Sequence, residues 1–144
     1  PIMMIKGTVG GMRERRFGRI VNITSQMVKS PFSVMGLSAG ARTGLTAASK
    51  ALSREVAAYN VTINNLLPER IDTERQVYMA QQRAESAGIT YEEARQEMVE
   101  SIAAKRMGRP EEFGAACAFL CSAQAGYISG QNLQLDGGSY RGTF

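Results

Sequence analysis

The stretch Gly18-Arg-Ile-Val-Asn-Ile-Thr-Ser25 decides the fold class of this chain. It is rich in Ile and Val with little alternation, which is typical of a strand buried on both faces. A loop containing Pro31 and Gly36 follows, and a long helical pattern then runs from about Leu37 to Asn60. A buried strand joined to a long helix indicates an α/β protein.

The expected helix after Leu37 carries two stripes of side chains. Apolar residues at steps of three and four form one helix face: Leu37, Ala41, Leu45, Ala48, Leu52 and Val56. A polar stripe runs about a hundred degrees round from it: Ser38, Arg42, Thr46, Ser49 and Ser53. Because Ser25 ends the strand while Ser38 and Arg42 begin the helix, we expect these three polar groups at one end of the sheet. In open α/β sheets that end binds ligands.

The remaining sequence alternates helices and strands. A first helix is expected from Ile2 up to a stop at Gly18, although it contains several glycines. Val61 to Leu67 reads as a second buried strand halted by Pro68, and Asn132 to Leu135 reads as a short last strand. Such alternation favours right-handed crossovers and a parallel sheet.

The segment from Asp72 to Gly108 predicts a pair of charged helices. Thr73 is a candidate cap for the first helix, and Gly88 ends it. Thr90 and Glu93 form a capping box for the second helix. Its inward-facing residues are expected to be Ala94, Met98 and Ile102. Arg109-Pro110-Glu111-Glu112 then marks the start of another helix, with Pro in its first turn.

Length and composition favour one ordered domain. The chain has 144 residues, of which 44% are apolar and 21% charged, and such values are typical of globular proteins. The net charge is +4. The cluster Arg13-Glu14-Arg15-Arg16 either binds phosphate or complements the negative end of the first helix, and the second interpretation is favoured. Aromatic residues do not interleave with these bases, so we expect no nucleic-acid partner.

Several functional classes are disfavoured by what the composition lacks. The chain has no His, which removes the usual acid/base group and zinc ligand. Cys117 and Cys121 are expected at small buried positions of one helix, so no metal site and no disulfide is predicted. Two free thiols suit a reducing cytoplasm. Neither a signal peptide nor an apolar run long enough to span a membrane is visible. A cytoplasmic protein without a membrane partner is therefore expected.

Four motifs follow one another near the C-terminal end: Arg106-Met-Gly-Arg-Pro-Glu-Glu-Phe113, Phe119-Leu, Tyr127-Ile-Ser-Gly130 and Leu135-Asp-Gly-Gly138. In this order and at these spacings they resemble the C-terminal signature of the short-chain dehydrogenase/reductase family. Gly18 to Ser25 is similar to the fifth strand of that family. Val61 to Thr73 is similar to its sixth strand and nicotinamide-side loop.

The resemblance implies a fold and a domain organisation. The fold would be the second half of a Rossmann-type doubly wound parallel sheet, with about three parallel strands and flanking helices. Residues 1–144 would form a single partial domain without the N-terminal dinucleotide-binding half. A glycine-rich phosphate turn is not found, since Gly7-Thr-Val-Gly10-Gly11 has the wrong spacing and lies in a helical pattern.

The resemblance also implies site residues. Ser25 would polarise the substrate carbonyl, while Ser38 and Arg42 occupy the positions of the family's proton-donating Tyr and its partner Lys. An aliphatic hydroxyl is far less acidic than a phenol, and Arg stays protonated, so the replacement is not conservative.

The nicotinamide-side loop is partly kept. Pro68, Ile71 and Thr73 match the residues that hold the nicotinamide end of NAD or NADP. Glu69 replaces an expected Gly, and its side chain is predicted to crowd the loop.

Two hypotheses of function follow. In the first, the chain is an oxidoreductase that moves hydride between NAD(P) and a small carbonyl or alcohol, seen as a truncated product or as part of a longer chain, and inactive by itself. In the second, it is a non-catalytic binding or scaffold relative that has lost the proton relay. An unpaired edge of the leading strand, together with the two helices beside Ser25, predicts a homo-oligomer in both cases. The sequence does not identify the substrate, and it does not distinguish NAD from NADP as the cofactor.

Overall fold

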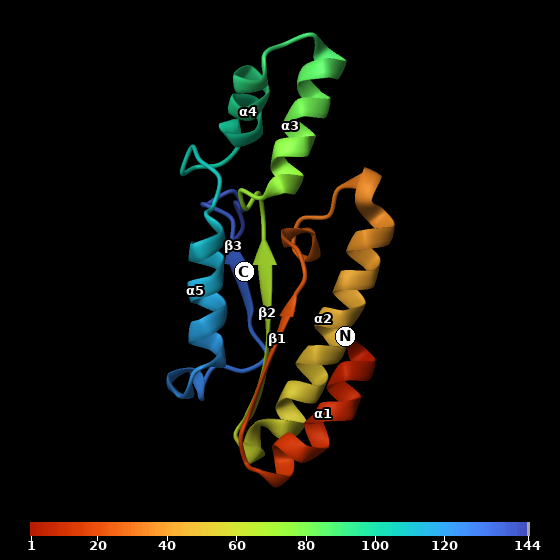
Figure 1. Cartoon of the computed structure of the whole chain (residues 1–144). Coiled ribbons are helices and arrows are strands. Elements are labelled where there is room, and N and C mark those ends of the chain that lie inside the picture. The colour runs from red at the N-terminus through yellow and green to blue at the C-terminus, as the bar shows by residue number, and fades with distance from the viewer. Residues whose placement is uncertain (144) are drawn as a thin grey trace.

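The computed structural model describes residues 1–143, which form a three-stranded sheet with helices on both faces. The helices are α1 (Ile2–Glu14), α2 (Gly36–Val56), α3 (Glu74–Ala87), α4 (Tyr91–Glu100) and α5 (Pro110–Cys121), and the strands are β1 (Gly18–Ile23), β2 (Val61–Pro68) and β3 (Asn132–Leu135) (Figure 1). No helix among these residues is long and apolar enough to cross a membrane.

The sheet is parallel throughout. β1 pairs with β2, and β2 pairs with β3, so the strand order follows the chain. The α/β prediction of about three parallel strands is confirmed. Within residues 1–143 the outer edge of β1 has no partner strand, and the side chain of Ile23 on β1 is 59% exposed.

The helices form two layers around the sheet. α1 and α2 cover one face and α5 covers the other, while α3 and α4 project beyond the carboxyl ends of the strands (Figure 1). Val56 of α2 packs with Val61 and Ile63 on the first face. Leu120 of α5 packs with Leu66 on the second face. β2 is therefore buried on both sides, as predicted for Val61 to Leu67.

Only the C-terminal end of the apolar stripe of α2 packs on the sheet, where Leu52 and Val56 contact β2, and the rest of the stripe is exposed or half-buried. Leu37 is 93% exposed, whereas Thr46, Ser49 and Ser53 of the polar stripe are each at most 7% exposed. These small side chains let α2 lie close to the strands. Their polar atoms still find partners, as in the bond from the Ser53 hydroxyl to the carbonyl oxygen of Lys50 at 2.8 Å.

A row of three asparagines crosses the sheet beneath α2. Asn22 of β1, Asn65 of β2 and Asn132 of β3 occupy matching positions in the strand pairing. The Asn22 amide nitrogen donates to Asn65 at 3.1 Å and to the Ser49 hydroxyl at 3.0 Å, and the Asn65 amide donates to Asn132 at 2.8 Å. This row explains why a polar helix face can be buried here.

The first helix ends earlier than predicted. α1 stops at Glu14, and Gly18 begins β1 instead of closing the helix. Arg16 makes the turn with a φ of +53°, and its guanidinium donates to the carbonyl oxygen of Ala58 at 3.1 Å. Arg13 lies in the last turn of α1, as expected, and its guanidinium stacks over the Tyr59 ring at 4.4 Å.

The α3–α4 pair has its own small core. Ala80 of α3 packs with Ala94 and Met98 of α4 and with Ile102 beyond it, so the predicted inward-facing residues are confirmed. Thr90 and Glu93 form the predicted capping box.

On α5, Cys117 is half-buried and belongs to the core cluster of that face. Cys121 is exposed, so the prediction that both cysteines are buried is wrong for Cys121. Leu120 and Ala125, instead of Cys121, belong to the core cluster on this face of the sheet.

Candidate active site

A cleft of about 690 Å³ lies at the carboxyl ends of β1 and β2, beneath α3. This volume is within the range of small-molecule sites. All six residues predicted for the site line this one cleft: Ser25, Ser38, Arg42, Pro68, Ile71 and Thr73. The structure therefore brings together residues that are up to 48 positions apart in the sequence. Their chemical roles stay predictions.

Ser25 follows β1 and begins a short 3-10 turn. It has an extended backbone, and its hydroxyl oxygen accepts a hydrogen bond from the backbone N–H of Met27 at 3.3 Å. A hydroxyl that accepts one bond still has its own hydrogen to donate. Ser25 is half-buried and lines the cleft, so that hydrogen is available to a ligand oxygen.

Ser38 and Arg42 lie one turn apart on α2. The Arg42 Nε donates to the Ser38 hydroxyl at 3.2 Å, and Nη1 donates to the backbone carbonyl oxygen of Thr24 at 2.6 Å. Both acceptors are neutral. Arg42 is therefore fixed next to Ser25 while its charge remains uncompensated by any carboxylate among residues 1–143.

The loop from Pro68 to Thr73 presents free backbone groups to the cleft. Gly108 bridges this loop, since its N–H donates to the carbonyl of Arg70 and its carbonyl accepts from the N–H of Asp72. In such a parallel bridge the N–H and C=O of the middle residue, Ile71, point to the opposite side. Neither group of Ile71 has a backbone partner in the described part of the chain.

Thr73 and Arg70 add two further features of this loop. Thr73 precedes α3, but its side chain makes no capping bond, so its hydroxyl is available to a ligand. Arg70 has a φ of +46°, a left-handed conformation that is rare for a residue other than Gly or Asn and that concentrates at functional sites.

Glu69 stands at the position of the family's Gly without blocking the cleft. Its carboxylate lies near Asp136 and Ser139, and Glu69 also lines a smaller neighbouring cavity of about 190 Å³. Burial raises the pKa of Glu69, and the Ser139 hydroxyl and the Arg70 charge offset only part of this rise. The Oε2 atom is buried without a hydrogen-bond partner among residues 1–143.

Sequence reasoning missed several residues of the cleft. Arg70, Arg75 and Gln76 line it together with an apolar group of side chains. The Gln76 Oε1 atom is buried without a partner in the described chain. Their position in the sequence could have indicated two of them, because Arg70 and Arg75 flank Ile71 and Thr73, which match the family's nicotinamide-side loop.

Two classes of group are absent from the cleft as far as residues 1–143 describe it. Its lining contains neither Tyr nor Lys. The same residues also contain no cluster of three His, Cys, Asp or Glu side chains that could hold a metal ion.

The fold is that of a Rossmann-type α/β protein with a cleft of ligand size at the carboxyl end of its sheet, and comparison with known proteins identifies its family. The family model described as "Enoyl-(Acyl carrier protein) reductase" matches residues 1–140. The chain belongs to the short-chain dehydrogenase/reductase family. The resemblance stated from the sequence is thereby confirmed.

Named relatives include reductases. The chain is 35% identical over 137 residues to the NADPH-dependent reductase BacG of Bacillus subtilis, covering 95% of this chain and 53% of that protein. It is 32% identical over 135 residues to the 3-oxoacyl-[acyl-carrier-protein] reductase FabG of Vibrio cholerae, covering 94% and 51%. The chain thus spans about half the length of the curated relatives that it matches.

Solved structures agree with this assignment. YwfH, an NADPH-dependent reductase involved in bacilysin biosynthesis, superimposes with a TM-score of 0.86 at 36% identity over 98% of this chain and 54% of its own. The L-sorbose reductase of Gluconobacter frateurii, solved with NADPH and L-sorbose, gives a TM-score of 0.90 at 28% identity with the same coverage.

Proposed function

We propose that this chain forms the substrate-side half of a nicotinamide-dependent reductase that transfers hydride between NAD(P) and a carbonyl or alcohol. One observation carries the proposal: Ser25, Arg42 and the loop from Pro68 to Thr73 line a single cleft at the carboxyl end of the sheet. BacG and YwfH are named as NADPH-dependent reductases, and a similar 3-oxoacyl (acyl-carrier-protein) reductase was solved with NADP bound, which supports NADPH as the cofactor. Because this chain matches only about half of each relative, we propose the hydride-transfer activity for the protein that contains this half.

The loop residues fit a nicotinamide carboxamide. Such a group has one N–H₂ donor and one carbonyl acceptor, and Ile71 has an unpaired C=O and N–H on the side away from Gly108. The uncapped Thr73 hydroxyl supplies a further bond. Pro68 lines the cleft at the end of β2 and shapes the wall beside these groups. When bound, the cofactor supplies or accepts the hydride.

On the substrate side, Ser25 and Arg42 have complementary roles. The Ser25 hydroxyl donates to the substrate oxygen, while Arg42, anchored to Thr24, supplies a permanent positive charge near the place where negative charge develops. Ser38 accepts from Arg42 and keeps the guanidinium in this position. Without a phenol in the cleft, the proton reaches the product oxygen from water.

The missing Tyr and Lys favour a second candidate function. A cleft without these groups in the described chain is also what a non-catalytic binding relative would have. Proton transfer by a positioned acid commonly contributes about 10²- to 10⁴-fold in rate. In this alternative, ligand binding persists while turnover is absent even in a longer natural chain.

A turnover assay distinguishes the reductase from the non-catalytic binding protein. NADPH consumption should be followed with a panel of ketones, using the natural gene product in its full length. The proposal predicts that Ser25→Ala lowers kcat/KM by about 100-fold, as the loss of one oxyanion donor does, while Ser30→Ala outside the cleft has no such effect. Restoring both family residues with Ser38→Tyr and Arg42→Lys should raise kcat. NADPH binding without turnover by either form would support the non-catalytic alternative.

We also propose that copies of this chain associate through α1 and α2. The outer side chains of these helices are apolar and exposed, with Met3 at 76%, Met4 at 75% and Leu37 at 93%. Exposed apolar groups on this scale mark interaction surfaces. Sedimentation velocity should show an oligomer, and Met4→Glu with Leu37→Glu should shift it to monomer. A wild-type monomer at micromolar concentration would exclude this proposal.

A further inference from the structure

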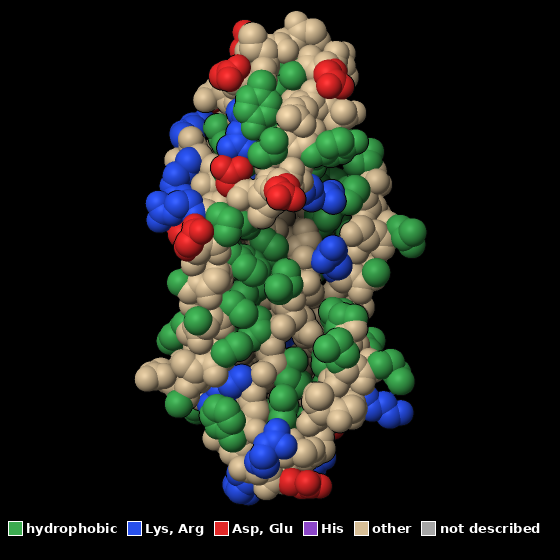
Figure 2. Space-filling view, in the orientation of Figure 1, with side chains coloured by type: hydrophobic (Ala, Val, Ile, Leu, Met, Phe, Trp, Pro, Cys, Tyr) green, Lys and Arg blue, Asp and Glu red, His purple; other side chains and the backbone are tan. Residues whose placement is uncertain are grey.

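Three arginines line the Ser25 cleft, and only one acidic residue accompanies them. Arg42 comes from α2, Arg70 from the loop after β2, and Arg75 from the first turn of α3. The single acid is Glu69, whose Oε1 lies 3.8 Å from the Arg70 Nε. Figure 2 shows basic side chains beside hydrophobic ones at the level where α3 meets the sheet.

These arginines have weaker carboxylate contacts than other arginines of the described chain: Arg42 and Arg75 have none, and Arg70 has only its neighbour Glu69 at 3.8 Å. Among residues 1–143, the Arg75 side chain has no hydrogen bond and no ion pair, and the Arg70 Nε is buried without a hydrogen bond. By contrast, Arg83, Arg95 and Arg106 each bond a carboxylate at 2.7–2.8 Å. The cations of the cleft are therefore left available to a ligand.

The surroundings make the cleft more positive still. α3 begins here, so the positive end of its dipole and its first unpaired N–H groups lie at the cleft. The Thr73 side chain does not cap them. Burial raises the pKa of Glu69, which weakens its tendency to carry the only compensating negative charge. An anionic ligand group would relieve the mutual repulsion of the guanidinium groups.

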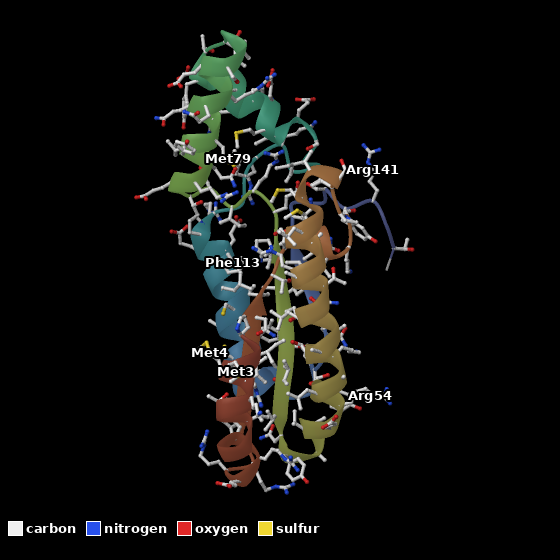
Figure 3. All side chains as sticks on the ribbon, turned by 90° about the vertical axis from the view of Figure 1, so that its right-hand side faces the viewer. Met3, Met4, Arg54, Met79, Phe113 and Arg141 are labelled. Atoms are coloured by element: carbon white, nitrogen blue, oxygen red, sulfur yellow. The ribbon has the colours of Figure 1, made fainter. Side chains whose placement is uncertain are left out.

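Apolar side chains form the remaining walls of the cleft. Phe32 and Met35 precede α2, while Met79 of α3 and Phe113 of α5 lie on the other side. Figure 3 shows Met79 above Phe113, near the first turns of their two helices. Arg75 and Met79 are four residues apart on α3, so a cation and an apolar contact share one helix face.

We propose that this cleft selects carbonyl substrates that carry a carboxylate beside an apolar body, with Arg70 and Arg75 binding the carboxylate. The proposal rests on the reductase function proposed above and narrows its substrate class. Arg42, held by Thr24 and Ser38, remains next to the reacting oxygen. A guanidinium binds a carboxylate through two parallel hydrogen bonds, which gives direction as well as charge.

Two probes that differ in one group, a carboxylate in the first and a methyl in the second, test this proposal. They are 4-phenyl-2-oxobutanoate and its neutral counterpart 4-phenyl-2-butanone, with binding measured by calorimetry and by chemical shifts of the protein. We expect the keto acid to bind more tightly, and less so as salt is added. Arg75→Gln and Arg70→Gln should each reduce the affinity ratio of the two probes by about 10- to 100-fold, the usual effect of losing a charge-assisted hydrogen bond.

Matched variants and a measurement of NADPH binding show whether the arginines bind the substrate carboxylate or the cofactor. Arg75→Lys should keep part of the preference, and Arg54→Gln, at an exposed position of α2, should keep all of it. Equal affinity for the two probes would overturn the proposal. It would also be overturned if Arg75→Gln weakened NADPH binding while leaving the probe ratio intact, because the arginines would then serve the cofactor phosphates. Since binding is measured without turnover, a preference for the keto acid would support this inference even in an inactive protein.

Discussion

Arg42 of α2 donates a hydrogen bond of 2.6 Å from Nη1 to the backbone carbonyl oxygen of Thr24, the residue just before Ser25. This bond joins the start of the long helix to the end of β1, across 18 positions of sequence. Thr24 is itself fixed to β2, because its N–H donates to the carbonyl of Leu66 at 2.9 Å. The position of Ser25 in the cleft therefore depends on a side chain from another element.

Arg42→Ala should destabilise the protein by about 1–3 kcal/mol, the usual range for a partly buried hydrogen bond to a charged group. The measurement is urea unfolding followed by circular dichroism. Arg54→Ala is the matched control, because Arg54 lies on the same helix and points outward (Figure 3). Equal stability of the two variants would show that the bond to Thr24 adds nothing.

Glu69 gives the protein a distinctive pH dependence. Its pKa is raised mainly by burial, so the folded state disfavours the ionised form. For a raised carboxyl pKa, stability is lost as pH rises from the usual Glu value of about 4.5 through the higher folded value. Glu69→Gln should therefore be more stable than the wild type at pH 8, and the difference should shrink as pH falls towards 4. A constant difference across this range would contradict the buried-carboxylate explanation.

Most of the fold could be predicted from local patterns. Val61 to Leu67 reads as a buried strand halted by Pro68, and β2 covers Val61–Pro68. Gly88 is predicted to end its helix, and it follows α3 with a φ of +66°. Pro110 begins α5 as predicted. These features depend on one residue and its neighbours, which is why the sequence alone reveals them.

The orientation of α2 could not be predicted in the same way. Spacing shows that Leu37 and Leu45 share a face, but it does not show which face meets the sheet. Asn22 and Asn65 decide this, because buried amides require polar partners and Ser49 supplies one. The cationic character of the cleft was missed for a similar reason. Arg70 and Arg75 look like ordinary surface charges until the fold places them beside Arg42.

The asparagine row should be sensitive to the loss of its central member. Asn65→Leu removes the acceptor of the Asn22 amide and the donor to Asn132. Since Asn65 is only 1% exposed, water cannot replace both bonds, and the cost should be about 1–3 kcal/mol. Asn132→Leu, at the half-buried end of the row, should cost less than half as much. Thermal unfolding measures both variants, and the reverse ranking would show that the row does not act as a connected network.

A bidentate ion pair joins Asp72, in the loop between β2 and α3, to Arg95 of α4, and so holds the α3–α4 pair next to the sheet. Nη1 and Nη2 of Arg95 each donate to one carboxylate oxygen of Asp72 at 2.8 Å. The pKa of Asp72 is lowered mainly by this hydrogen bonding to Arg95. Because the folded pKa lies below the usual 3.8, this stabilisation is complete above about pH 5 and disappears as pH falls through the folded value.

Asp72→Asn should therefore loosen α4 at pH 7 without unfolding the sheet. The Arg95 side chain is 27% exposed, against 52% for Arg83, which pairs with Glu97 at the outer end of the same helices. Exposed pairs contribute about 0.2–1 kcal/mol, so amide exchange in α4 should become about two- to fivefold faster in Asp72→Asn and change less in Glu97→Gln. As pH falls through the lowered folded pKa of Asp72, the wild-type pair weakens and the two variants should come to exchange alike. If α4 exchanged at the wild-type rate in Asp72→Asn at pH 7, the hydrophobic contacts of Ala80, Ala94 and Met98 would be sufficient to hold the pair in place.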